Sequence, residues 1–322
     1  SEMGRYWQRM SERSHPLAYL IFDASHAHNF ELERVEQLAQ RCGYSIISTE
    51  KDATNPNAIK IIFDHDQWRI HLDNSAAIVS VDFSDPRFYT RANSSALQGE
   101  YVVRAVLGRK KTTQPLTVLD ATAGFGHDAF LLAAAGCQVT LAEQMPLLAY
   151  LLEQAVQRAQ NNTNDFLVSA AERMTVIEAN SVTLMQQWSA SRPDVIYLDP
   201  MYAHADNESK RGLKKSAAVK KNMAFLQRLT THQETVPAET MSAEAVPSAE
   251  PSGHFDEDSD LITADSQSLV NSDGEGMIEA ALALAKSKVV VKRAPGAEWL
   301  GGRKPASSIT GKATRFDIYP LS

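Results

Sequence analysis

Short apolar runs alternate with helical patterns through the second half of the chain, which is the arrangement expected of a parallel sheet flanked by helices. The apolar runs predict strands at residues 117–120, 138–143, 174–179, 195–199 and 288–293. Helices are predicted at 146–160 and 277–286, and a final alternating run at 314–319 is expected to form an edge strand. The predicted fold class is therefore α/β, with a mostly parallel, Rossmann-like sheet.

A smaller α/β pattern comes first in the chain. Strands are predicted at 17–23, 44–49 and 77–83, a helix at 31–41, and a hairpin from 59–64 and 68–72. We therefore expect a flexible tail at residues 1–15, a small N-terminal α/β domain at 16–98 and a larger domain at 99–322. Four histidines of the small domain have neither metal-ligand spacing nor a paired acid, so no metal site is expected there: His26, His28, His65 and His71.

One segment of the larger domain differs in composition from the rest. Residues 231–276 are rich in Ser, Ala and Pro, and twelve acidic residues with no Lys or Arg lie between Glu234 and Glu279. Such a composition is typical of a disordered acidic insertion. The whole chain has 32 basic and 39 acidic residues, a net charge of −7, but without those twelve acids the balance is 32 minus 27, or +5. The charge is therefore compatible with an anionic partner.

The sequence lacks the patterns of membrane and secreted proteins. No apolar run reaches the length that crosses a membrane, and no secretory signal pattern opens the chain. The two cysteines, Cys42 and Cys137, have no metal-binding spacing, and such sparse thiols favour a reducing compartment over a disulfide framework. We expect a soluble, cytoplasmic protein.

The stretch from Thr117 to Asp128 predicts a strand, a glycine turn and the start of a helix, because Gly124 and Gly126 break the apolar run that ends at Asp120. Glycine lets the backbone approach a ligand, and the helix start offers free N–H groups, so a nucleotide-like ligand is expected. The pattern Asp-x-x-x-Gly-x-Gly resembles motif I of the class I S-adenosylmethionine (SAM)-dependent methyltransferases, in which acids hold the ammonium of the cofactor. Glu143 ends the next strand about 20 residues later and can accept both ribose hydroxyls.

A second motif follows the strand at 195–199. Asp199-Pro200-Met201-Tyr202 resembles the Asp/Asn-Pro-Pro-Tyr/Phe motif of methyltransferases that modify the exocyclic amines of bases, and these four are the predicted catalytic residues. The lone pair of a base amine is delocalised into the ring, so the nitrogen attacks poorly unless acceptors such as the Asp199 carboxylate and the Pro200 carbonyl pull on its N–H groups. Tyr202 can stack on a base that has left its helix. This chemistry does not distinguish adenine N6 from guanine N2.

Basic residues near these motifs are candidates for contact with RNA phosphates, with a solvated helix face as the alternative. They are Lys210, Arg211, Lys214, Lys215, Lys220, Lys221, Lys292 and Arg293. The stretch 82–109 also mixes arginines with aromatic residues. That mixture fits either a nucleic-acid grip or a domain-joining helix with a solvated basic face.

Four stretches, at 120–129, 197–202, 289–293 and 315–319, together resemble one family. It is the ribosomal small-subunit methyltransferase J family, which methylates the N2 amine of one guanosine in bacterial 16S ribosomal RNA. The resemblance spans most of the chain outside the N-terminal tail and the acidic insertion. It implies SAM as cofactor, S-adenosylhomocysteine as product, and 16S ribosomal RNA or the small ribosomal subunit as partner.

The resemblance also implies cofactor-binding positions. Besides Asp120, Gly124 and Gly126 of the glycine turn, these are His127, Asp128, Glu143, Gln144, Asn180, Ser181 and Asp199. The family often has Arg where this chain has His127 and Gln144, and the acidic insertion is not part of its pattern. Helix capping is an alternative role for Asp128 and Ser181.

The expected function is SAM-dependent methylation of guanine N2 in 16S ribosomal RNA, by a protein that acts as a monomer without a metal. Two alternatives stay open. One is another DNA or RNA base-amine methyltransferase, acting on adenine N6 or guanine N2, and the other is a non-catalytic, rRNA-binding assembly factor with the same fold. A nicotinamide-dependent oxidoreductase is disfavoured by Asp120 and by the Asp-Pro-Met-Tyr turn.

Overall fold

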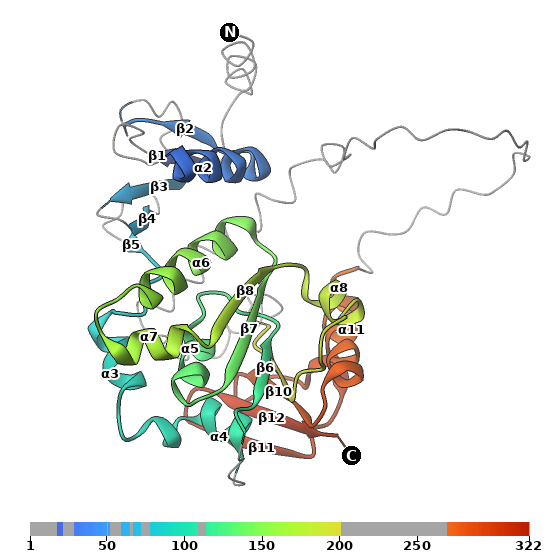
Figure 1. The fold of residues 1–322 in the computed structure, drawn as a ribbon. Helices are drawn as coiled ribbons and strands as arrows, with labels where there is room; N and C mark the ends of the chain where they lie inside the picture. Colours follow the sequence, from blue (N-terminus) through green and yellow to red (C-terminus); the bar gives the residue numbers. More distant parts are fainter. Residues whose placement is uncertain are drawn as a thin grey trace, which may run out of the picture.

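The computed structural model describes residues 18–21, 29–49, 51, 59–64, 67–71, 78–108, 114–200 and 269–321. Two sheets form within these residues, a five-stranded sheet near the N-terminus and a seven-stranded sheet. Helices cover both faces of the larger sheet (Figure 1). The α/β class predicted from the sequence is confirmed.

The larger sheet has the strand order β11-β12-β10-β9-β6-β7-β8. Its strands are β6 (Thr117–Asp120), β7 (Gln138–Glu143), β8 (Met174–Glu178), β9 (Val195–Leu198), β10 (Lys288–Arg293), β11 (Ser307–Thr310) and β12 (Arg315–Pro320). The strands from β10 to β8 in this order pair in parallel, whereas β12 runs antiparallel to β10 and β11. The strand order reverses between β6 and β9, so their carboxyl ends flank the crevice where open α/β sheets bind ligands.

The prediction that the last strand lies at an edge is wrong. β12 lies between β10 and β11, and β11 is the edge strand on this side of the sheet. The residues 307–310 are Ser-Ser-Ile-Thr, too short and polar a run to predict a strand, so their pairing with β12 was not visible in the sequence. The interior place of β12 explains why Phe316, Asp317 and Tyr319 are all buried.

Successive side chains of each central strand point to opposite faces of the sheet. Val118 of β6 packs on the layer that contains α5 (His127–Ala134), α6 (Pro146–Gln160) and α7 (Asp165–Ala171). Its neighbour Leu119 packs on the other layer, formed by α8 (Ser181–Gln186) and α11 (Leu269–Leu284). Burial on both faces accounts for the unbroken apolar runs of these strands.

Helix α11 begins at Leu269 rather than at 277, so it includes the end of the expected insertion. A Cβ placed on Gly301 would lie 2.8 Å from Ile278 Cγ2 and 3.1 Å from Glu275 Cα, so glycine lets the short helix η7 (Leu300–Gly302) pack directly against α11. Gly301 also has a φ of 58°, which favours glycine. At the other end, Arg192 donates from Nε and Nη2 to carbonyls of the last turn of α11.

The smaller sheet has the order β2-β1-β3-β4-β5, and the predicted hairpin is the antiparallel pair β3-β4. Its elements are β1 (Ala18–Ile21), α2 (Asn29–Cys42), β2 (Ser45–Ile47), β3 (Ile59–Asp64), β4 (Gln67–His71) and β5 (Ile78–Val79). Helix α2 meets α6 through an ion pair, with Arg34 Nη2 2.5 Å from Glu153 Oε2. Leu20 and Ile61 belong to the same buried cluster as α5 and α6, so the two sheets are joined by apolar packing.

The chain passes from the smaller sheet to β6 through α3 (Pro86–Ala92), η3 (Leu97–Gly99) and α4 (Tyr101–Leu107). Arg91 donates to both carboxylate oxygens of Glu100, at 2.7 and 2.6 Å, and Arg104 lies over the ring of Tyr101. These two arginines are thus engaged within the connecting helices, which favours the domain-joining interpretation for this part of the stretch. No helix in the described ranges is long and apolar enough to cross a membrane.

Candidate active site

The carboxyl ends of β6, β7 and β9 bring the predicted acids to one edge of the larger sheet. Asp120 and Glu143 are the last residues of β6 and β7, and Asp199 directly follows β9. Parallel pairing of these strands aligns their ends, so residues far apart in the sequence become neighbours. The edge predicted for ligand binding is the edge where these acids lie.

The two glycines of the turn after β6 have different surroundings, so glycine is needed at each for a different reason. Both have a positive φ, 54° at Gly124 and 71° at Gly126. A Cβ on Gly126 would lie 2.6 Å from Leu152 Cδ1 and 3.3 Å from Phe83 Cζ, so this glycine is required by packing. A Cβ on Gly124 would meet nothing closer than the Thr122 carbonyl oxygen at 3.9 Å. Gly124 therefore has open space on one side, where the backbone can approach a ligand.

Glu143 is fixed against this turn by backbone N–H groups. Its Oε2 accepts a hydrogen bond from Gly124 N at 3.0 Å, and its Oε1 accepts one from Met145 N at 2.8 Å. Burial raises the pKa of Glu143 to about 7 although these donors oppose the shift. Each carboxylate oxygen has a second lone pair, so the group can still accept hydroxyls.

Asp120 is only 2% exposed and accepts one hydrogen bond from Thr122 N at 3.1 Å. Burial raises the pKa of this carboxyl to about 8, and the negative charges of Asp128 and Asp199 add to the shift. A carboxyl in such surroundings gains most from the approach of a positive charge. The site therefore suits a ligand that carries a cation.

Lys292, near the end of β10, joins two of the acids. Its Nζ lies 2.6 Å from Asp128 Oδ2 and 2.9 Å from Asp199 Oδ2, and Asp128 Oδ2 also accepts the hydroxyl of Tyr197 at 2.6 Å. Burial alone would lower the pKa of Lys292, but the two carboxylates outweigh it and raise the pKa. The pKa values of the two acids, Asp128 and Asp199, shift in opposite directions.

For Asp128, burial favours the neutral form, but the Lys292 ammonium and the hydrogen bonds lower its pKa below the ordinary value. For Asp199, burial raises the pKa above its ordinary value although Lys292 opposes the shift. The difference follows from the contacts, because Asp128 accepts from both Tyr197 and Lys292. Asp199 thus keeps more affinity for a proton than Asp128 does.

Thr122 forms hydrogen bonds with residues of both motifs. Its backbone N–H donates to Asp120 Oδ1, and its Oγ1 accepts the backbone N–H of Asp199 at 2.6 Å. The start of the Asp-Pro-Met-Tyr turn is therefore fixed to the glycine turn by a side chain that neither motif pattern singled out.

Asn180, Ser181 and Gln144 gather at the same edge. Asn180 is the N-cap of α8, accepting from Val182 N and Thr183 N, and its Nδ2 donates to Gln144 Oε1 at 3.1 Å. Ser181 Oγ donates to the Ala121 carbonyl, so Ser181 is not the cap. Asp128 does not cap α5 either, since the N-cap there is Gly126. Helix capping, the alternative role suggested for Asp128 and Ser181, is therefore wrong for both residues.

His127 is exposed at the start of α5, with its ring between two aromatic side chains. The ring centroids lie 4.9 Å from Phe88 and 6.2 Å from Phe125, the latter nearly parallel at 17°. Its place beside the glycine turn matches the prediction, but its described contacts are aromatic rather than ionic.

Arg293 is buried beside the loop that follows β10. Its side chain is only 5% exposed, and Nε and Nη2 donate to the Glu298 carbonyl at 3.0 and 2.8 Å. RNA contact by Arg293 and by Lys292 stays a prediction, and Lys292 contacts two acids of the site. The sequence run Val-Val-Val-Lys-Arg predicted the strand but not the neighbour that its polar residues would face.

Several predicted residues lie outside the described residues. They are Met201, Tyr202, Lys210, Arg211, Lys214, Lys215, Lys220 and Lys221. Within the described part of the chain, no group of three or more His, Cys, Asp or Glu side chains could hold a metal ion.

Comparison with known proteins agrees with this geometry. Residues 46–249 and 266–321 match the model of a family described as "Putative SAM-dependent methyltransferase". The ribosomal RNA small subunit methyltransferase J of Pseudomonas paraeruginosa is 35% identical over 247 residues, 77% of this chain and 76% of the relative. That of Thioalkalivibrio sulfidiphilus is 38% identical over 244 residues, 75% of each. The chain belongs to the ribosomal RNA small subunit methyltransferase J family.

A crystal structure of a SAM-dependent methyltransferase has a similar fold. A SAM-dependent methyltransferase from Neisseria gonorrhoeae has a TM-score of 0.59 and 27% identity, and the match covers 94% of this chain and 95% of the other. The residues at the sheet edge fit the SAM of this family, because Gly124 leaves space for a ligand and the buried carboxyls of Asp120 and Glu143 lie at the ends of β6 and β7.

Proposed function

We propose that this protein transfers the methyl group of SAM to the N2 amine of a guanosine in 16S ribosomal RNA. The observation that carries the proposal is the position of Asp199, which begins the Asp-Pro-Met-Tyr turn and lies beside the glycine turn and Lys292. The relatives named above are methyltransferases of the small-subunit RNA. The proposed partner is accordingly the 16S RNA or the small subunit, met in the cytoplasm.

Four groups are proposed to hold the cofactor. Glu143 accepts the ribose hydroxyls with the lone pairs that its backbone donors leave free, and Asp120 pairs with the ammonium. Gly124 allows the close approach of the backbone, and Asn180 with Ser181 is proposed to hold the adenine. When bound, SAM supplies a methyl group on a positively charged sulfur.

Asp199 is proposed to orient the target amine. Lys292 contacts its Oδ2, so Oδ1 is available to accept one amine N–H, and the Pro200 carbonyl accepts the other. These two acceptors would localise the nitrogen lone pair, so that the amine could attack the methyl group that bound SAM would supply. The nitrogen then loses a proton, and a carboxylate with a raised pKa such as Asp199 is suited to take it.

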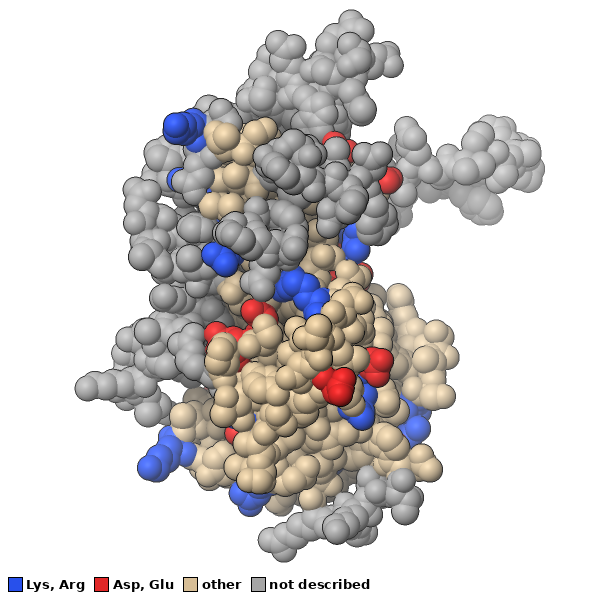
Figure 2. Space-filling model, turned by 60° about the vertical axis from the view of Figure 1, so that its left-hand side comes forward, with Lys and Arg blue, Asp and Glu red and all other residues tan. Residues whose placement is uncertain are grey.

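Binding of RNA is proposed to involve cations near this edge. Figure 2 shows, on one face of the molecule, Lys and Arg side chains of the described residues in small separate groups, several of them beside acidic side chains. The cluster at 210–221 lies outside the described residues, and it remains the candidate for phosphate contact.

The test is methyl transfer from radiolabelled SAM to small subunits that lack the modification, followed by digestion to nucleosides. We expect label in N2-methylguanosine with the wild-type chain, and loss of label in Asp199→Ala, with the Kd for SAM measured in both proteins. Asp165→Ala is the matched control, because Asp165 is an exposed acid on α7 away from the strand ends.

Two outcomes would contradict the proposal. Label in N6-methyladenosine would assign the chain to the other class of base-amine methyltransferase. No transfer to subunits, naked RNA or DNA, with measurable SAM binding, would favour a non-catalytic assembly factor.

A further inference from the structure

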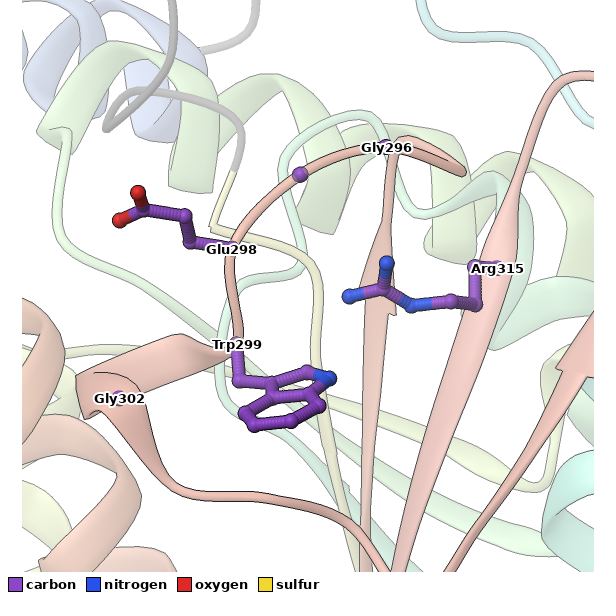
Figure 3. A pocket seen from close by; sticks show the side chains of 6 residues that line it. Gly296, Glu298, Trp299, Gly302 and Arg315 are labelled. Carbon is purple, nitrogen blue, oxygen red and sulfur yellow. The ribbon is translucent and has the colours of Figure 1, made fainter.

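A pocket lies on the loop that follows β10. It has a volume of about 480 Å³ and is lined by Gly296, Ala297, Glu298, Trp299, Gly302 and Arg315 (Figure 3). Sites for small ligands have volumes of about 300–1,000 Å³, so the pocket can hold a group as large as a nucleobase. None of its residues belongs to the cofactor site described above.

An aromatic ring with a cation near it dominates this pocket. Trp299 is 40% exposed, and its indole points into the same space as the guanidinium of Arg315, while the carboxylate of Glu298 points away (Figure 3). The Nζ of Lys304 lies 6.0 Å from the centroid of the indole ring. An exposed indole ring can stack on a planar ligand such as a base.

Hydrogen bonds from two arginines fix the loop that carries Trp299. Arg293 donates twice to the Glu298 carbonyl, and Arg315 Nη1 donates to the Pro295 carbonyl at 2.9 Å. Arg315 is fixed in turn by the buried carboxylate of Asp317, with two contacts of 2.8 Å. Trp299 therefore sits on a preorganised loop, which lowers the entropic cost of binding.

The pocket lies on the loop that leaves the carboxyl end of β10. β10 pairs in parallel with β9, which Asp199 follows, so this loop starts at the same edge of the sheet as Asp199.

We infer that the Trp299 pocket binds an unstacked base of the RNA strand beside the target guanosine. This inference rests on the proposed function, because it requires an RNA substrate. Removal of the target base from its helix leaves neighbouring bases unstacked, and an indole face can replace the lost stacking for any base. The Lys304 ammonium at the rim suits the phosphate of the same nucleotide.

The test compares Trp299→Ala, Trp299→Phe and the wild-type chain in methyl transfer to naked, unmodified 16S RNA and to unmodified small subunits. Loss of one stacked base weakens binding by about five- to a hundredfold, so we expect KM for RNA to rise by that factor in Trp299→Ala. Trp299→Phe keeps a ring and should recover most of the affinity. The Kd for SAM and the Tm should stay at the wild-type values, because Trp299 touches neither the cofactor site nor the core.

Tryptophan fluorescence provides a second, direct measurement. Addition of unmodified RNA should quench the emission of wild-type protein and of Trp188→Phe, whose altered residue lies at the opposite end of the sheet, but not that of Trp299→Phe. An unchanged KM for naked RNA in Trp299→Ala would overturn the inference, as would an effect confined to intact subunits, which would indicate a protein partner. Failure of the proposed function is distinguishable, because the wild-type chain itself would then transfer no methyl group.

Discussion

The ammonium of Lys292 lies 2.9 Å from Asp199 Oδ2, and this contact follows from the pairing of two strands that are distant in the sequence. β10 pairs in parallel with β9, and Val291 is the partner of Leu198, so the next residues of each strand, Lys292 and Asp199, come side by side. The same ammonium holds Asp128. A carboxylate that must orient a base amine is therefore itself fixed by a partly buried cation.

Replacement of Lys292 by Met should impair catalysis in a pH-dependent way. Without the shared cation the pKa of Asp128 and of Asp199 should rise, so a larger fraction of Asp199 is protonated at a given pH. We expect kcat at pH 7 to fall, with partial recovery at higher pH. Removal of one partner from a buried pair should also lower the free energy of unfolding by on the order of 3 kcal/mol. The measurement is the pH dependence of kcat from pH 6 to 9.

Lys288→Met is the matched control for this change. Lys288 lies at the other end of β10, and its Nζ donates to the Ala105 carbonyl rather than to an acid. Its loss should leave the pH profile of kcat in place. If the two variants have the same profile as the wild-type protein, Lys292 does not position Asp199.

The two glycines of the turn should respond differently to alanine. Gly126→Ala places a Cβ 2.6 Å from Leu152 Cδ1 at a φ of 71°, so strain and overpacking should together destabilise the protein by about 2–4 kcal/mol. Gly124→Ala meets no close atom, so only the strain of a φ of 54°, about 1 kcal/mol, should appear in stability. Its Cβ should instead weaken SAM binding. Urea unfolding and calorimetric titration with SAM measure the two effects separately, and equal losses of stability would refute the distinction.

The raised pKa of Asp120 predicts how stability depends on pH. This carboxyl titrates at about 8 when folded and near 4 when unfolded, so between these values the folded state keeps a proton that the unfolded state has lost. The free energy of unfolding should therefore fall as pH rises from 5 to 8, by up to about 1.4 kcal/mol per pH unit for one group. Glu143, with a pKa of about 7, contributes in the same sense.

Asp120→Asn tests this dependence, because an amide keeps the acceptor for Thr122 N and has no charge to titrate. We expect the loss of stability between pH 5 and 8 to be smaller in the variant than in the wild-type protein. Urea unfolding at each pH provides the measurement, and parallel curves for the two proteins would show that the carboxyl ionises normally.

The sequence predicted the strands of the cofactor site because they are buried on both faces and bounded by glycine or proline. Thr117–Asp120, Gln138–Glu143 and Lys288–Arg293 have the predicted bounds. The acids at the carboxyl edge were predictable for the same reason, since strand ends that are parallel must share an edge. The local pattern of apolar and polar residues was therefore sufficient to predict the position of a residue that depends on its own strand alone.

Contacts between strands could not be predicted in this way. Whether Lys292 or Arg293 faces Asp199 depends on sheet order and register, and neither is encoded in the run Val-Val-Val-Lys-Arg. The edge strand β11 is short and polar, and its pairing depends on β12. Thr122 was missed because a lone threonine between two aspartate motifs has no spacing signal, although its hydroxyl joins them.

Thr122→Val should separate positioning of Asp199 from binding of the cofactor. Valine has nearly the same shape but no hydroxyl, so the backbone N–H of Asp199 loses its acceptor at 2.6 Å, while Thr122 N can still donate to Asp120. An unsatisfied, partly buried N–H costs about 1–3 kcal/mol, and release of the Asp-Pro turn should lower kcat by about tenfold with little change in the Kd for SAM. Thr122→Ser keeps the hydroxyl and should retain most of kcat. Steady-state kinetics with SAM titration distinguishes the cases: a variant that loses SAM affinity but keeps kcat would place the role of Thr122 in the glycine turn rather than in the orientation of Asp199.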